Sequence, residues 1–170
     1  METKIERITK EMGHVIEIEN SLTMLKMPQA IGEGYHKIET YLETQDAKMV
    51  DMPYVRYLDI DWEDQMSKGF FGNLIAAFRK KWHFQVGMQV SKPLEDSGEL
   101  KASTIAPKKY LKTMHHGHYQ KVGQTYRRMY DYAKEMRIDL EGESIEIYLN
   151  SPQEVKEPEL ETIVLIPIKS

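Results

Sequence analysis

The chain has 170 residues, a length that suits one compact domain or two half-domains sharing a core. A net charge of -4 argues against a nonspecific nucleic-acid binder, and the absence of cysteine excludes disulfides, a thiol nucleophile and cysteine metal sites. No apolar run approaches the roughly 20 residues that cross a bilayer, and the N-terminus lacks the apolar core of a signal peptide. We therefore expect a cytoplasmic protein without membrane attachment.

The first half of the chain predicts strands alternating with helices. Residues 1–13 form an N-terminal extension. Pro53 indicates that the second strand either begins near this residue or lies at a sheet edge. The basic run Arg79 to Lys81 suits the end of a helix, where cations complement the helix dipole. In chain order the predicted segments are a strand (14–27), a turn with a helix (28–42), a strand (49–61), a short amphipathic helix (70–81) and a strand (82–90).

The second half begins after residues 91–99, a loop rich in Pro, Gly and charge that serves as the linker between the halves. Residues 104–136 run from a strand through Gly117 into a strongly amphipathic helix. Residues 143–168 contain two strands joined by a connection rich in Pro and Glu. One domain over residues 14–170 follows, with halves at about 14–90 and 100–168.

Two short motifs occur in the same order in both halves. Residues 35–38 (YHKI) match residues 119–122 (YQKV), and residues 57–59 (YLD) match residues 148–150 (YLN). This order predicts a duplicated strand-helix-strand-strand unit, with the helix at 70–81 inserted only in the first copy. The expected fold class is α+β: duplicated β-α-β-β units forming two antiparallel sheets about a pseudo-twofold axis, with helices on one face and a ligand cleft on the other.

The strand that begins at residue 144 places an unusual pair on one face. Ile145, Ile147 and Leu149 alternate with Glu146 and Tyr148. If the aliphatic residues lie under the helices, the carboxylate and the tyrosine face the cleft. Polar residues on the solvent face of a strand are ordinary, so the pattern alone leaves a solvated surface as the alternative.

The same alternation predicts that Val55, Tyr57 and Asp59 face the cleft from the first half. Trp82 shares its face with aliphatic and aromatic neighbours, which favours the core over the cleft. Tyr119 lies on an apolar helix stripe, where core packing and a cleft position are equally consistent with the pattern.

The C-terminal segment EIYLNSPQEVKEPELETIVLIPI resembles the signature of the GyrI-like small-molecule-binding family, which also supplies the effector-binding domain of multidrug-responsive transcription activators. HGHYQKVGQTYRRMYDY and PYVRYLDIDW are similar to other segments of that family, and the resemblance spans residues 14 to 168. It implies a central pocket in which a glutamate, here Glu146, and aromatic residues receive cationic, lipophilic compounds without a cofactor. The ligand-binding residues expected on this basis are Glu146, Tyr148, Tyr57, Tyr119, Trp82 and Val55.

The resemblance leaves two functions open. The first is a binding protein for sensing, sequestration or inhibition of a partner such as DNA gyrase or a regulator. The second is a hydrolase of electrophilic compounds, in which Glu146 activates water or attacks and Tyr148 acts as the acid. Thirteen residues before the domain are too few for a helix-turn-helix, so we expect a stand-alone member with no direct nucleic-acid contact.

Three histidines, His115, His116 and His118, form the only histidine cluster of the sequence. Adjacent residues of a strand point to opposite faces, so His115 and His116 are poorly placed to share a metal ion. We expect surface or turn histidines and no metal site. The sequence also lacks a Gly-rich phosphate loop and a serine elbow.

Overall fold

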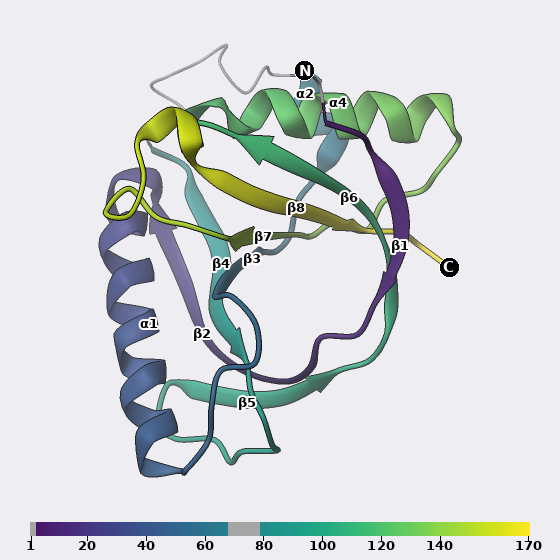
Figure 1. Ribbon diagram of the computed structural model, residues 1–170. Helices are drawn as coiled ribbons and strands as arrows, with labels where there is room; N and C mark the ends of the chain where they lie inside the picture. The colour runs from purple at the N-terminus through teal and green to yellow at the C-terminus, as the bar shows by residue number, and fades with distance from the viewer. Residues whose placement is uncertain (1–2, 68–78) are drawn as a thin grey trace.

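The computed structural model describes residues 3–67 and 79–170, and in that part eight strands form one curled antiparallel sheet (Figure 1). The order across the sheet is β1-β6-β8-β7-β3-β4-β2-β5. Residues 70–78 of the predicted inserted helix lie outside the described residues. The strands are β1 (Glu6–Lys10), β2 (Gly13–Thr23), β3 (Tyr54–Tyr57), β4 (Lys81–Gln89), β5 (Leu100–Ile105), β6 (Lys108–His116), β7 (Ser144–Tyr148) and β8 (Glu161–Pro167).

The helices connect these strands. The described α-helices are α1 (Met27–Thr44), α2 (Trp62–Ser67) and α4 (Val122–Glu135), and short 3-10 turns are η1 (Met24–Lys26), η2 (Tyr119–Lys121) and η3 (Glu157–Glu159). None of the described helices is both long enough and apolar enough to cross a membrane.

The prediction of two separate sheets is wrong, because β3 of the first half pairs directly with β7 of the second. Val55 lies opposite Glu146 in this pairing. Joining the two strands satisfies backbone groups that two separate sheets would leave at exposed edges. The expected extension at residues 1–13 supplies β1, which pairs with β6. Each half does contain a strand, a helix and two further strands in that order. The pseudo-twofold repeat itself stays a prediction.

Both long helices pack on the same face of the sheet, on the outer side of the curl (Figure 1). Helix α1 covers β4 closely enough that a Cβ added to Gly34 would lie 3.1 Å from the Val86 side chain. Helix α4 contributes Met129 to a buried cluster with Val164 of β8. Cross-strand pairing links Val86, Val55, Glu146 and Val164 in one row, so all four side chains share this helix-covered face.

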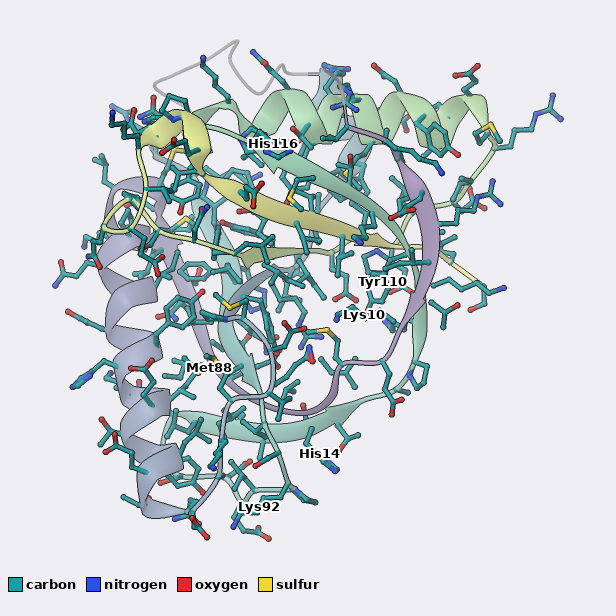
Figure 2. The ribbon with its side chains drawn as sticks, viewed as in Figure 1. Lys10, His14, Met88, Lys92, Tyr110 and His116 are labelled. Carbon is teal, nitrogen blue, oxygen red and sulfur yellow. The ribbon has the colours of Figure 1, made fainter. Side chains whose placement is uncertain are left out.

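The opposite, inner face has a separate apolar cluster. Ile145 and Ile147 pack there with Tyr54 of β3 and Tyr110 of β6, which is labelled in Figure 2. The prediction that Ile145, Ile147 and Leu149 lie under the helices is therefore wrong. Alternation tells which residues share a face, but the curl buries aliphatic residues on both faces, so alternation could not tell which face the helices cover.

Candidate functional site

Glu146 lies in the middle of β7, on the helix-covered face between the regions that α1 and α4 cover, and is only 6% exposed. Both of its carboxylate oxygens accept hydrogen bonds from tyrosines. Tyr126 of α4 donates to Oε1 at 2.9 Å, and Tyr148 donates to Oε2 at 2.8 Å. The cleft was expected on the uncovered face, whereas the carboxylate lies on the face that carries the helices.

Tyr126 is a site residue that the sequence reasoning missed. It lies on the apolar stripe of α4 and is buried, and its ring centroid is 5.7 Å from that of Trp62. Its hydroxyl also lies 3.0 Å from Ser144 Oγ. A buried tyrosine usually has a hydrogen-bond partner, so a tyrosine on an otherwise apolar stripe was the signal that could have identified it.

Several predicted ligand-binding residues lie near the carboxylate: Tyr148, Tyr57 and Tyr119 interact electrostatically with Glu146, and Val55 lies opposite it in the sheet. The ring of Tyr119 meets the ring of Tyr148 edge-on, with centroids 5.5 Å apart. The ring of Tyr57 meets Trp82 edge-on, with centroids 6.3 Å apart. The buried apolar cluster beside the site contains Met27, Val55, Phe84 and Val86. Partly buried residues pack against it: Leu22, Ala30, Ile31, Tyr35, Tyr57, Trp82 and Tyr148.

Asp59 does not join this group. It follows the end of β3, is exposed and has a positive φ of 54°. Its carboxylate instead pairs with His83, which also contacts Glu19. The strand alternation that predicted an inward side chain does not extend to residue 59, because β3 ends at Tyr57.

The electrostatics of Glu146 are dominated by burial. Removal from water raises the pKa of this carboxyl, and the hydrogen bonds from Tyr148 and Tyr126 offset only part of the rise. Burial, followed by the nearby charge of Glu146, holds the pKa values of the Tyr126 and Tyr148 hydroxyls well above their usual range. Within residues 3–67 and 79–170, no Lys, Arg or His side chain forms an ion pair with Glu146.

The histidines are dispersed rather than convergent. His115 is buried, contrary to the expected surface position, with Nδ1 2.8 Å from Thr125 Oγ1 and Nε2 3.1 Å from the His118 carbonyl oxygen. His116 and His118 lie near Glu161 and Glu157. In the described part of the chain, no three His, Cys, Asp or Glu side chains are grouped to hold a metal ion.

Two surface hollows lie away from Glu146. One is between α1 and β5, beside Tyr41 and Glu99, and the other is beside Arg128 on α4. Neither hollow includes Glu146, whereas the Glu146 site combines a buried carboxylate with converging hydroxyls and aromatic rings. That combination makes the surroundings of Glu146 the candidate binding site.

The fold is shared with several solved structures. The crystal structure of the EcmrR C-terminal domain aligns with a TM-score of 0.71 at 13% identity, covering 100% of this chain and 99% of that one. A hydrolase from Listeria innocua aligns with a TM-score of 0.67 at 14% identity, covering 99% and 93%. SAV2435, solved bound to tetraphenylphosphonium, aligns with a TM-score of 0.55 at 12% identity, covering 100% and 95%.

At these identities the structural similarity establishes the fold alone. Among curated proteins, none matches this sequence significantly. The sequence profile of the GyrI-like small molecule binding domain, however, matches residues 14–169, which is nearly the whole chain. The resemblance noted in the C-terminal strands is thereby confirmed over both halves, and the chain belongs to the GyrI-like family of small-molecule-binding domains.

Proposed function

We propose that the site around Glu146 binds cationic, lipophilic small molecules. The observation that carries this proposal is a buried carboxylate whose two oxygens accept tyrosine hydroxyls and which has no ion-pair partner in the described part of the chain. A buried carboxylate without a counter-ion is unfavourable, and an incoming cation supplies the missing charge.

The aromatic residues give the cation a second source of attraction. Tyr148 and Tyr119 present ring faces and edges near the carboxylate, and Tyr57 and Trp82 lie on the α1 side. A cation within about 6 Å of an aromatic ring gains roughly 0.5 to 2 kcal/mol, with the larger value when water is excluded. Lipophilic substituents of the ligand would contact the aliphatic residues of the same cluster. SAV2435, which shares the fold, binds an aromatic phosphonium cation of this kind.

The decisive experiment is Glu146→Gln, which keeps the shape and hydrogen-bonding capacity of the side chain but removes its charge. We expect tetraphenylphosphonium to lose about 10- to 150-fold in affinity, since a charge-assisted contact contributes roughly 1.5 to 3 kcal/mol. The neutral triphenylphosphine oxide should bind both proteins equally. Isothermal titration calorimetry measures both.

Glu6→Gln is the matched control, because it removes the same charge from a half-exposed carboxylate on β1 that faces Lys112. It should leave both affinities unchanged. Equal binding of the cation by the parent protein and by Glu146→Gln would overturn the proposal, and Glu146 would then be a structural residue.

A hydrolase of electrophilic compounds is the second candidate, favoured by the likeness to the Listeria innocua hydrolase. Here Glu146 would activate water or attack, and Tyr148 would protonate the leaving group. The raised pKa of the Tyr148 hydroxyl makes it a weak acid, which favours binding over catalysis. In a hydrolase, Glu146→Gln abolishes turnover of an electrophilic ester but retains its binding, and Tyr148→Phe lowers turnover without lowering affinity.

In either case the functional unit we propose is the domain from residue 14 to the C-terminus. A cation-binding site of this kind suits sensing or sequestration, and it suits ligand-dependent inhibition of a partner such as DNA gyrase or a regulator. Pull-down of a candidate partner with and without tetraphenylphosphonium separates inhibition from sequestration, since inhibition requires a protein partner and sequestration does not.

A further inference from the structure

Tyr35 lies on α1 one residue after the glycine that allows this helix to approach the sheet. Tyr35 packs against two apolar clusters, one with Ile38 and Met88 and one with Val55 and Val86. Its ring packs in the same apolar cluster as Tyr57 and Tyr148. Helix α1 thus contributes an aromatic residue on the side of the site opposite α4.

The Tyr35 hydroxyl is buried and has no hydrogen-bond partner among residues 3–67 and 79–170. Two other tyrosines of the site differ in this respect. The hydroxyls of Tyr126 and Tyr148 both donate to Glu146. A buried hydroxyl without a partner is unfavourable in a folded protein. The Tyr35 hydroxyl therefore either costs stability without a compensating function or forms its hydrogen bond with a bound ligand.

The position of this hydroxyl relative to Glu146 favours a role in binding. The carboxylate oxygens accept from Tyr126 and Tyr148, and neither of them accepts from Tyr35. The negative charge of Glu146, after burial itself, nevertheless raises the pKa of the Tyr35 hydroxyl, which places the hydroxyl within the electrostatic field of the carboxylate. The hydroxyl therefore stays protonated and keeps a hydrogen to donate, within the field of the carboxylate that would attract a cation.

We propose that Tyr35 determines ligand specificity: its hydroxyl donates to an oxygen acceptor on the bound molecule, so the site prefers lipophilic cations that carry an ether, hydroxyl or carbonyl oxygen. This inference rests on the proposed cation binding at Glu146. It goes further by naming a second polar contact and hence a narrower class of ligand. Binding sites that combine an apolar wall with a few placed polar groups obtain their specificity from those groups.

The test uses matched pairs of phosphonium ions. Each (methoxyphenyl)triphenylphosphonium isomer (ortho, meta and para) is compared with the corresponding (ethylphenyl)triphenylphosphonium, which replaces the ether oxygen by a methylene group at nearly the same size. For at least one isomer, the parent protein should bind the methoxy compound about 2- to 10-fold more tightly, the range that one neutral hydrogen bond supplies. Tyr35→Phe should remove this preference while leaving affinity for the ethyl compound unchanged.

Tyr41→Phe is the control, because it makes the same substitution on the same helix at a hydroxyl that donates to the Glu95 carbonyl at 2.8 Å, away from the site. It should keep the methoxy preference. Thermal unfolding without ligand gives a second measurement: the midpoint of Tyr35→Phe should hold or rise, because the substitution removes a buried hydroxyl without a partner.

The outcomes separate this inference from the function on which it rests. If no phosphonium ion binds, or if Glu146→Gln binds them unchanged, the proposed function fails and the inference with it. If the ions bind through Glu146 but no methoxy isomer is preferred, or if the preference survives in Tyr35→Phe, only the role of Tyr35 is overturned.

Discussion

Each face of the sheet buries one carboxylate that accepts a hydrogen bond from tyrosine, but the two carboxylates differ in their other partners. On the inner face, Glu17 of β2 is 4% exposed and accepts from the Tyr54 hydroxyl at 2.8 Å and from Arg56 Nη2 at 3.0 Å. On the helix-covered face, Glu146 is buried to a similar degree but accepts only from tyrosines. Burial raises the pKa of both carboxyls, and only at Glu17 does a neighbouring positive charge offset the rise.

This difference matches a structural role for Glu17 and the binding role that we propose for Glu146. Glu17 belongs to a closed network in which Arg56 also contacts Gln85 and lies 3.7 Å from Glu143, so strands from both halves are tied together. An incoming cation would find that carboxylate already paired. Glu146 is similarly buried and also accepts from tyrosines, but no cation pairs with it in the described part of the chain, which is the arrangement expected if a ligand completes the site.

The largest effect that distinguishes the two carboxylates is on folding stability. Glu17→Gln should lower the free energy of unfolding by about 2 to 3 kcal/mol, because it leaves the Arg56 charge without its closest carboxylate. The loss stays below that of a fully buried pair, since Arg56 is 19% exposed and keeps its contact with Gln85.

Glu146→Gln should have the opposite sign, unchanged or up to about 1 kcal/mol more stable, because it removes an unpaired buried charge. Urea denaturation of both variants at neutral pH measures the difference. A loss of stability in Glu146→Gln as large as that in Glu17→Gln would contradict the distinction between the two faces.

A second effect, of intermediate size, is the pH dependence of the stability difference between Glu146→Gln and the parent protein. The folded-state pKa of Glu146 is raised, so its contribution to stability is fully present below the usual carboxyl pKa and is lost as pH rises through the raised value. The advantage of Glu146→Gln over the parent protein should therefore be absent below the usual carboxyl pKa and should grow as pH rises through the raised value.

Cation affinity should change in the opposite direction, falling as pH is lowered through the raised pKa, because the protonated carboxyl is neutral. Binding of tetraphenylphosphonium across this range measures it. In Glu146→Gln the same titration should be flat, and a pH dependence that persists in the variant would assign the titrating group elsewhere.

The sequence predicted which residues of the strand at 144–149 share a face better than it predicted the architecture around that strand. Alternation in residues 144–149 correctly separated Glu146 and Tyr148 from Ile145 and Ile147, because a period of two is a local property of a strand. Which face the helices cover depends on the curl and on the β3–β7 pairing, neither of which is encoded in a local pattern. Pairing between distant segments also determines the Glu17–Arg56 network, which the sequence reasoning did not find.

The boundaries of the helices and strands were also predicted only approximately from local patterns. The strand predicted at residues 14–27 ends at Thr23, and η1 and the first residue of α1 occupy its remainder. The strand predicted at residues 49–61 is reduced to Tyr54–Tyr57, because Pro53 precedes it and Asp59 adopts a positive φ after it. The clear alternation of residues 82–90, by contrast, is confirmed as β4.

The smallest expected effects arise from removing one tyrosine hydroxyl on each face of the sheet. Tyr54→Phe and Tyr126→Phe each remove one hydroxyl that donates to a buried carboxylate, and each should lower stability by about 1 kcal/mol. Their consequences for the carboxylates should differ. Glu17 keeps Arg56, whereas Glu146 keeps only Tyr148, so Tyr126→Phe should raise the pKa of Glu146 further.

The readout is the pH at which tetraphenylphosphonium affinity falls by half. It should move upward in Tyr126→Phe and stay unchanged in Tyr54→Phe, whose ring remains on the other face above Gly87. Equal shifts in both variants would mean that the faces communicate electrostatically through the sheet, and the assignment of one carboxylate to structure and the other to binding would fail. A shift confined to Tyr126→Phe ties the affinity to the hydrogen bonds of Glu146 itself, because no other described carboxylate accepts from that hydroxyl.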